Sequence, residues 1–280
     1  MMQGVDIMRE LLNKIRNNQV TLIDTHKGLT NKNYYLNDDG NEYMVRIPYP
    51  NSEHIVSYVN EEKAIKAIAS HDIDVPCLYY DVNSGLKISK YLNNTTCYQD
   101  CNYVNKIEMV AKLLRKFHDL KIKINSSFDY IEKFNTYKNH TSNMPYEFPY
   151  LDKVLSEVCK VKRDYVLCHN DVVDGNLLFV NDRLYLIDFE YACDNDPYFD
   201  VISFLSENEI YDESLRKRFY DVYFDHYDEN TLADLRYLEL YADALWCHWA
   251  IMMYEARQQQ IYLDIAKSKY DAYCKLIKII

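Results

Sequence analysis

The chain has 280 residues, with 32 lysines and arginines against 43 aspartates and glutamates, and its formal net charge is −11. This acidity, without a cluster of basic residues, argues against a nucleic-acid-binding protein, because phosphate neutralisation dominates such affinities. It is compatible with a cationic ligand or with Mg²⁺. Only 5 residues are glycine, so neither common glycine-rich nucleotide loop is expected. A hydrophobic content of 48% indicates a folded protein with one large domain or two lobes.

The N-terminus is predicted to form a helix rather than a targeting segment. Asp6 and Glu10 interrupt the apolar run that a signal peptide needs, and the apolar residues around them recur at helical spacing. The longest apolar stretch, near residues 244–254, is too short and too polar to span a bilayer. The eight cysteines lack metal-ligand spacing and are expected to be reduced thiols. We therefore expect a cytoplasmic protein without membrane insertion.

The first ninety residues are predicted to be rich in strands. Runs of β-branched and aromatic residues alternate with turn signals, and Asp38-Asp39-Gly40 is typical of a hairpin. A hinge is expected at residues 91–94. The predicted strands lie at residues 20–25, 33–37, 42–47, 78–80 and 86–89, and a predicted helix lies at 55–70.

After the hinge, the spacing of the apolar residues becomes helical. Helices are predicted around 107–118, around 151–158 and from residue 213 onward. Two short apolar runs, at 165–169 and 183–189, are predicted strands that enclose the densest polar segment of the chain. The expected fold class is therefore α+β and bilobal, with a small β-rich N-lobe and a larger helical C-lobe. The predicted lobes cover residues 1–92 and 93–280.

The polar segment holds the residues with the clearest chemistry. His169, Asp171 and Asn176 lie on a turn-rich stretch, and Asp188 follows the second apolar run. Phosphoryl transfer needs a carboxylate near the attacking hydroxyl and hard oxygen ligands for Mg²⁺, and this set supplies both. Two other interpretations stay open. The polar side chains could merely cap turns, or they could form a metallohydrolase site, for which a second histidine at ligand spacing is missing.

The segment HNDVVDGN, followed by LIDFE, resembles the catalytic and metal-binding loops of the choline/ethanolamine kinase family, within the wider aminoglycoside phosphotransferase and protein-kinase-like superfamily. The N-terminal segments are similar to those of the bacterial choline kinases of the LicA type. The resemblance implies a protein-kinase-like fold, ATP as co-substrate and Mg²⁺ as cofactor. The other segments that carry it are KGLTNKNYYL, EYMVRIP, DIDVPCLYYD, SGLKISKYL, LWCHWAIMM and YLDIAKSKYDAY.

The resemblance implies a role for each matching residue of the catalytic segment. Asp171 would be the catalytic aspartate that orients the substrate hydroxyl, and Asn176 and Asp188 would be the Mg²⁺ ligands. His169 would hold the shape of the loop, and Asp200 would brace this loop from behind.

On the nucleotide side, the resemblance gives Arg46 the position where protein kinases carry a lysine. A guanidinium there can clamp phosphates bidentately. The spacing to Pro76 favours Glu62 as its helix partner, with Glu61 as the alternative. Where protein kinases have glycines in the phosphate loop, this chain has polar side chains at Thr30, Asn31 and Asn33.

The only two tryptophans, Trp246 and Trp249, are three residues apart in a helical stretch and so share one face. A quaternary ammonium donates no hydrogen bonds, and proteins bind it with aromatic faces and nearby carboxylates. Ordinary core packing is the alternative. By the family match, Tyr262 would be a third aromatic wall, and Glu190 and Glu207 would supply negative charge near the cation.

We therefore expect an ATP-dependent choline kinase that transfers the γ-phosphoryl group to the choline hydroxyl. Ethanolamine, thiamine and aminoglycosides are alternative substrates of the same fold. A catalytically inactive kinase-like binding protein is the alternative from a different class, and the presence of Asp171, Asn176 and Asp188 argues against it. Neither a nucleic-acid nor a membrane partner is expected.

Overall fold

The computed structural model describes residues 2–17, 19–25, 28–161 and 163–280. Lys27, the first residue of the KGLTNKNYYL segment, lies outside the described residues. The chain forms two compact units: Met1–Cys101 joins Gly175–Ala192, and Asn102–Asp174 joins Cys193–Ile280. The predicted division at residue 92 therefore differs from the observed one, because residues 93–101 and a later hairpin segment pack with the first unit.

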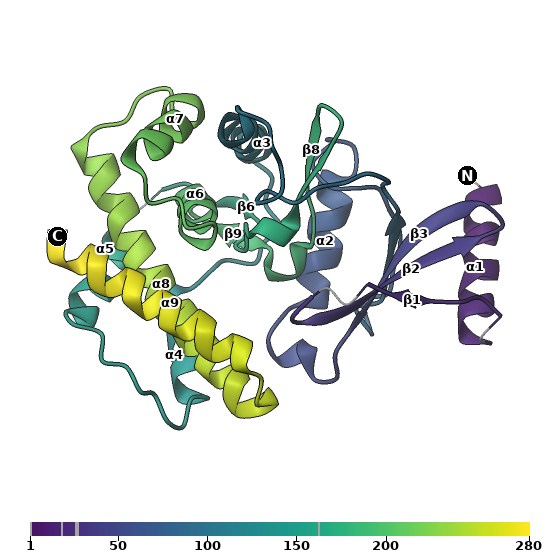
Figure 1. Ribbon diagram of the computed structural model, residues 1–280, viewed down its shortest axis with the longest axis horizontal. Coiled ribbons are helices and arrows are strands. Elements are labelled where there is room, and N and C mark those ends of the chain that lie inside the picture. Colours follow the sequence, from purple (N-terminus) through teal and green to yellow (C-terminus); the bar gives the residue numbers. More distant parts are fainter. Residues whose placement is uncertain (1, 18, 26–27, 162) are drawn as a thin grey trace. The chain divides into compact units, whose positions relative to one another are not determined.

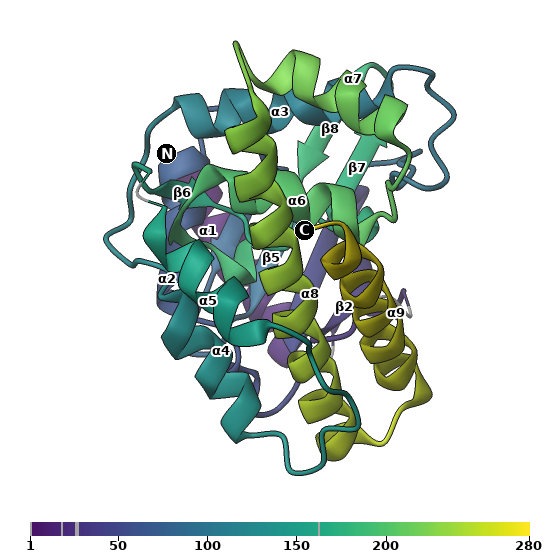
Figure 2. The ribbon, with the colours of Figure 1, turned by 90° about the vertical axis from the view of Figure 1, so that its left-hand side faces the viewer.

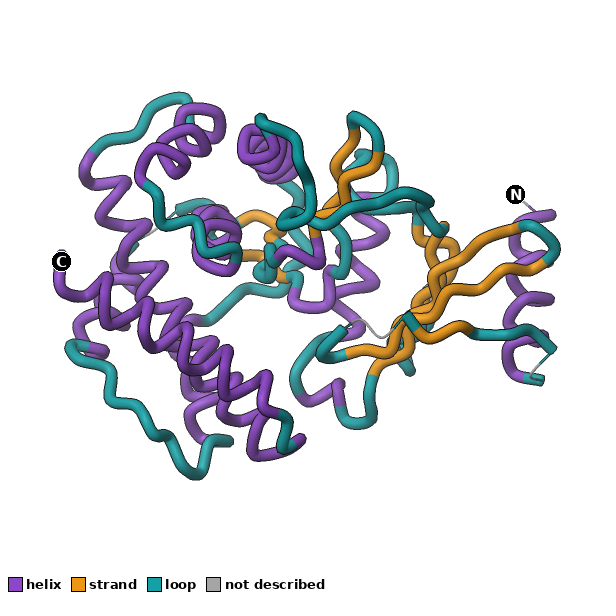
Figure 3. The backbone as a smooth tube through the Cα atoms, in the orientation of Figure 1, coloured by secondary structure: helices purple, strands orange, loops and turns teal. Residues whose placement is uncertain are grey.

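The first unit contains most of the β-structure (Figures 1 and 3). Its sheet has the order β1-β2-β3-β5-β4, and neighbouring strands are antiparallel. Its elements are α1 (Met2–Arg16), β1 (Ile23–Asp24), β2 (Asn31–Asp38), β3 (Asn41–Pro48), the short helix η1 (Ser52–His54), α2 (Tyr58–Ile68), β4 (Cys77–Tyr80), β5 (Lys87–Lys90), β7 (Leu177–Val180), β8 (Arg183–Leu186) and the short helix η3 (Phe189–Tyr191).

The hairpin predicted at Asp38-Asp39-Gly40 is confirmed. Asp38 of β2 pairs with Asn41 of β3, and the two residues between them have φ values of 52° and 88°. Positive φ costs glycine nothing and aspartate little, which is why this sequence closes the turn. The register that follows from the turn determines which side chains of β3 face the core.

One face of this sheet is covered by α1. Leu11 and Leu12 of the helix form a buried cluster with Leu36, Val45 and Ile88 of three strands. Side chains alternate along a strand, so Arg46, which follows Val45, is directed to the opposite face. The apolar packing of one face thus fixes where this buried cation lies.

The two apolar runs predicted as neighbouring strands pair with other partners. The first gives β6 (Val166–Cys168), which pairs with β9 (Cys193–Asn195), whereas β8 pairs with β7. The sequence analysis missed β7, because its apolar residues follow the polar segment directly, without a turn between them. The polar segment was predicted to be a loop between two paired strands. It instead connects β6, which belongs to the small sheet with β9, to β7, which belongs to the small sheet with β8.

The second unit is mainly helical, and its long helices α8 and α9 lie side by side (Figures 2 and 3). The short helix η2 (Asp174–Asn176) spans the boundary between the units. The remaining elements are α3 (Lys106–Asp119), α4 (Tyr130–Asn139), α5 (Leu151–Lys160), β6, β9, α6 (Pro197–Glu207), α7 (Glu213–Tyr223), α8 (Glu229–Arg257), α9 (Gln260–Leu276) and the short helix η4 (Ile277–Ile279).

Tyrosine is the characteristic core residue of the second unit. Tyr137, Tyr241, Tyr262 and Tyr273 are among its largest fully buried side chains. A buried phenol needs a hydrogen-bond partner, and the Tyr241 hydroxyl, for example, donates to the backbone carbonyl of Tyr130 at 2.8 Å. Much of the unusual tyrosine content of the chain is thus used for packing.

Two expectations about the whole chain can be compared with the described residues. Within them, no helix has the length and apolar character needed to cross a membrane. None of the cysteines in the described part of the chain forms a disulfide.

We predict that Gly85→Ala destabilises the first unit more than Gly40→Ala. Both glycines have positive φ, but a Cβ at Gly85 would lie 2.6 Å from the Tyr58 ring and 2.8 Å from the Pro48 ring, whereas a Cβ at Gly40 would meet nothing within 4 Å. Gly40→Ala should cost about 1–2 kcal/mol from backbone strain alone. Gly85→Ala should cost about 1–3 kcal/mol more from the clash. Urea unfolding measures both, and equal losses would contradict the steric argument.

Candidate active site

Arg46 is the centre of a buried ion cluster in the first unit. Its Nη2 lies 2.6 Å from Glu61 Oε2, and its Nη1 donates to Asp188 Oδ1. Nη2 also donates to the backbone carbonyl of Gly85 at 3.3 Å. Burial alone would lower the pKa of Arg46, but the Glu61 and Asp188 carboxylates outweigh it and raise that pKa well above its ordinary value. The guanidinium therefore stays charged and ties three segments together.

The prediction that Glu62 pairs with Arg46 is wrong, because Glu61 holds this position. Glu61 is fully buried on the inner face of α2 with Ala64, Ile65 and Ile68, whereas Glu62 forms an ion pair with Lys66 at the surface. Successive helix residues are turned by about 100°, so only one of two adjacent glutamates can face the sheet.

The hairpin of β7 and β8 brings the two candidate metal ligands together. Asn176 immediately precedes β7, and its carbonyl accepts a hydrogen bond from the amide of Ile187 at 2.9 Å. Asp188 is the next residue after Ile187. It has φ 69° and ψ 63°, a left-handed conformation that aspartate tolerates better than most residues. An amide oxygen and a carboxylate are thus available on adjacent strand ends, and both are hard donors.

The nucleotide segment contacts Glu190, which was predicted to face the substrate cation. The Glu190 carboxylate accepts hydrogen bonds from Thr30 Oγ1 at 2.5 Å and from Asn31 Nδ2 at 2.8 Å. Burial and the neighbouring Asp188 carboxylate raise the pKa of Glu190 to about 8. Its observed partners are therefore residues expected at the phosphate loop, and a substrate contact stays a prediction. Asn33 lies on β2 opposite Arg46.

In the second unit, Asp200 braces the segment that carries Asp171. Its two carboxylate oxygens accept from the backbone amides of His169 at 2.8 Å and Asn170 at 2.7 Å. His169 is fully buried, and its Nδ1 accepts from the Asp171 amide at 3.2 Å. Two side chains thus fix the backbone around Asp171, while Asp171 itself keeps a partly exposed side chain. This is the bracing geometry that the resemblance implies.

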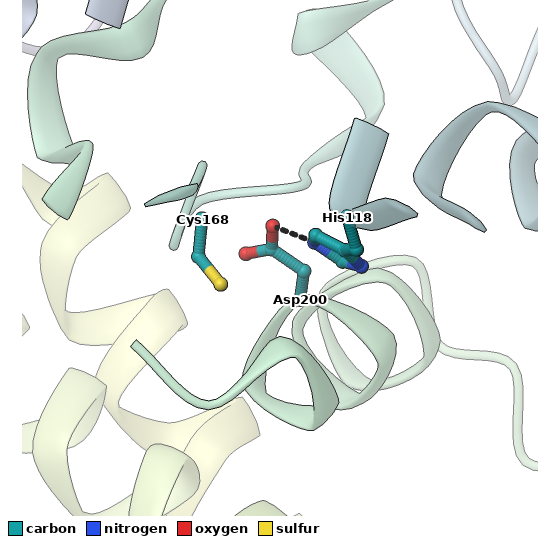
Figure 4. Close-up of side chains that lie close together, drawn as sticks. All are labelled: His118, Cys168 and Asp200. Atoms are coloured by element: carbon teal, nitrogen blue, oxygen red, sulfur yellow. Dashed lines mark hydrogen bonds and ion pairs between the residues drawn. The ribbon is translucent and has the colours of Figure 1, made fainter. Parts of the chain in front are cut away.

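Figure 4 shows His118, Cys168 and Asp200 close together, with His118 and Asp200 joined by a hydrogen bond. Their potential metal-ligand atoms lie within 4.8 Å of one another, but each already has a hydrogen-bond partner. His118 Nδ1 contacts the Tyr223 hydroxyl at 2.7 Å, and the Cys168 thiol donates to the Asn195 carbonyl at 3.5 Å. Burial raises the pKa of Cys168 well above its ordinary value, so the thiol stays protonated. The cluster supports Asp200 rather than forming a metal centre.

The predicted aromatic residues gather at one place in the second unit. The rings of Trp246 and Trp249 lie 6.0 Å apart in a T-shaped pair, and the ring of Tyr262 lies 5.8 Å from that of Trp249. The Tyr262 hydroxyl accepts from Arg257 Nη1 at 2.9 Å. The structure thus brings these three side chains together from α8 and α9, although they are up to sixteen positions apart in the sequence.

Glu207, the last residue of α6, has a charged partner that sequence reasoning missed. Lys269 Nζ lies 2.7 Å from Glu207 Oε1 and 3.6 Å from Asp243 Oδ1. Lys269 and Asp243 are buried. Asp243 lies in a largely apolar stretch of α8, whereas Lys269 lies among other charged residues of α9, so no signal in the sequence marked this pairing.

The chain is similar to known proteins in sequence and in fold. A model of the phosphotransferase enzyme family matches residues 22–241. Protein LicA of Haemophilus influenzae is 29% identical over 202 residues, which cover 67% of this chain and 58%, less than two thirds, of that relative.

Solved structures share the fold. The choline kinase LicA from Streptococcus pneumoniae has a TM-score of 0.81 at 20% identity and covers 98% of this chain and 100% of its own. A Plasmodium vivax ethanolamine kinase has a TM-score of 0.73 at 17% identity and covers 96% of this chain and 85% of its own. At these identities the likeness shows the fold, and it confirms the predicted α+β, protein-kinase-like class with a β-rich N-lobe and a helical C-lobe.

We predict that Glu61→Gln is strongly destabilising and that Glu62→Gln is nearly neutral. Glu61→Gln removes one of two carboxylates from a buried guanidinium, and breaking such a pair costs about 3–5 kcal/mol. Glu62→Gln removes an exposed ion pair that is worth at most about 1 kcal/mol. Chemical unfolding of the two variants makes the comparison, and similar losses would mean that Arg46 does not depend on Glu61.

Proposed function

The chain belongs to the phosphotransferase enzyme family, and on that premise we propose that it is a choline kinase, which transfers the γ-phosphoryl group of ATP to the hydroxyl of choline. Membership of this family and the similarity to LicA proteins support an ATP-dependent kinase that acts on a small alcohol. The choice of choline is ours, and the paired indoles of Trp246 and Trp249 carry it, with the fully buried Tyr262 packed against Trp249.

The first unit supplies the residues for ATP phosphates and for a divalent cation. The adjacent hard oxygen donors of Asn176 and Asp188 fit Mg²⁺, which when bound would neutralise charge on the phosphates. Arg46 would clamp phosphate oxygens, and its fixed charge is held in place by Glu61 at 2.6 Å. Thr30 and Asn31, whose side chains donate to Glu190, would hold that carboxylate at the place where protein kinases have phosphate-loop glycines.

The second unit supplies the residue for the substrate hydroxyl. Asp171 would orient this hydroxyl and accept its proton as the phosphoryl group is transferred. The backbone around Asp171 is fixed by Asp200 and His169, so the carboxylate needs little reorganisation. Alignment and preorganised charge therefore provide most of the rate.

Choline fits the aromatic cluster better than other alcohols do. A quaternary ammonium loses no hydrogen bonds when it moves from water to aromatic faces, and it gains cation–π attraction. The Glu207 carboxylate, paired with Lys269 beside Asp243, would supply negative charge near the cation. An aminoglycoside, which carries several ammonium groups, would need many acceptors instead.

The proposed site of the reaction is the cytoplasm, where ATP is supplied and thiols stay reduced.

We predict that Asp171→Asn lowers kcat by about 10²–10⁴-fold with little change in the affinity for ATP, because the carboxylate acts on the hydroxyl only. Asp174→Asn is a matched control, since it removes a carboxylate three residues further along the same segment. Its kcat should change by a few fold at most. Steady-state kinetics with Mg-ATP and choline measures both, and near-normal turnover of Asp171→Asn would contradict the role of Asp171.

We predict that Trp249→Ala raises the KM for choline by about 2–30-fold, which corresponds to a lost cation–π contact of about 0.5–2 kcal/mol. Trp249→Phe keeps an aromatic face and should recover most of the affinity. A substrate panel of choline, ethanolamine, thiamine and kanamycin tests the assignment with the unmodified enzyme. Equal losses of Trp249→Ala for choline and ethanolamine would mean that the indole only packs in the core, and a preference for another substrate would overturn the choice of choline.

A further inference from the structure

Lys269 of α9 is, with Lys87, one of the buried lysines in the described residues, and it lies beside α6 and α8. Its side chain is only 7% exposed, its Nζ lies 2.7 Å from Glu207 Oε1 and 3.6 Å from Asp243 Oδ1, and it donates to Ser206 Oγ at 3.0 Å. Ser206 Oγ in turn donates to Asp243 Oδ1 at 2.9 Å. An ammonium buried in this way is unusual unless it is paired.

The antiparallel register of α8 and α9 places this ion cluster next to the aromatic cluster. Asp243 of α8 lies opposite Lys269 of α9, and the Cys247 thiol donates to the Ala266 carbonyl at 3.3 Å. Further along, the ring of Trp249 contacts that of Tyr262. Along the pair of helices, the charged contact of Asp243 with Lys269 is therefore followed by the contact of Cys247 with Ala266 and then by the aromatic contact of Trp249 with Tyr262. Asp243 and Trp246 are also one turn apart, so they share a face of α8.

The charges of the cluster do not cancel. Two carboxylates, of Glu207 and Asp243, surround one ammonium, of Lys269, so that one net negative charge is left when both acids are ionised. The Glu207 side chain is 16% exposed and that of Asp243 is 1% exposed. Glu207 is therefore the carboxylate that a ligand can reach, and one of its oxygens is already committed to Lys269.

We propose that Lys269 is a positioning residue that selects a quaternary ammonium over a primary one, an inference that rests on the proposed function. Lys269 holds the Glu207 carboxylate in one orientation and occupies an oxygen that a primary ammonium would need. A primary ammonium gives up strong hydrogen bonds to water and recovers few of them here. A quaternary ammonium needs no acceptor, so it uses the net charge and the aromatic faces alone.

The test measures the binding of two simple cations without ATP. Trp246 and Trp249 are the only tryptophans of the chain, so their fluorescence reports directly on the cluster during titration with tetramethylammonium and with methylammonium. The unmodified protein should bind tetramethylammonium more tightly. Lys269→Met should reduce this preference by about tenfold or more, since a hydrogen bond to a charged group has about that value. Lys269→Arg should keep it.

Two further variants distinguish the loss of the Lys269 cation from a change in net charge and from the loss of any lysine of α9. Because Lys269→Met leaves two buried carboxylates unbalanced, the double variant Lys269→Met with Asp243→Asn restores one net negative charge without an internal cation, and it should also lose the preference. Lys267→Met removes an exposed lysine of α9 that pairs with Asp271 and should change neither affinity.

The inference would be overturned by the absence of a preference for tetramethylammonium in the unmodified protein, or by an unchanged preference in both Lys269 variants that lack a cation. Because no phosphoryl transfer is measured, failure of the kinase assay and failure of this selectivity test are separate outcomes. A loss that affects both cations equally would also overturn it, since that is the effect of a merely structural lysine.

Discussion

A buried arginine is the constraint on which the first unit is built. A guanidinium cannot lose its proton at any relevant pH, so burying it requires carboxylates from whatever segments surround it. Arg46 obtains them from α2, through Glu61, and from the end of β8, through Asp188. The position of the helix, the register of β3 and the hairpin that carries a candidate metal ligand are therefore coupled through one charge. Removing either carboxylate leaves the buried guanidinium with a single ionic partner and releases one of the segments that it ties together.

The second unit solves a similar problem with a carboxylate. Asp200 is fully buried and is stabilised by two backbone amides and by His118. The backbone amides just before Asp171 donate to the Asp200 carboxylate, and this carboxylate in turn fixes the shape of that loop. In each unit, a buried ionic group holds together backbone segments that lie far apart in the sequence. The apolar residues around it exclude water, so the ionic group must be satisfied by these segments.

The sequence allowed the local features to be predicted and left the pairings open. The Asp-Gly hairpin and the helical stripes depend on short-range signals, and the structure confirms them. The roles of the residues in the polar segment stay predictions. Glu61 was named only as the alternative to Glu62, because the spacing to Pro76 does not define the rotational phase of α2. The phase could have been read from the helix itself, since Glu61 lies three, four and seven residues before Ala64, Ile65 and Ile68. Lys269 could not have been assigned, because its partners come from two other helices and only tertiary packing brings them together.

The assignment of residues 175–192 to the first unit has a consequence for how the protein can be divided. The chain enters the first unit twice, so this unit is not a contiguous stretch of sequence. A fragment that ends at Cys101 would keep β3 and α2 but would lack Asp188, and Arg46 would retain only Glu61. The first unit therefore cannot be obtained by truncation, and producing it on its own would require the hairpin of β7 and β8 to be grafted onto the N-terminal segment.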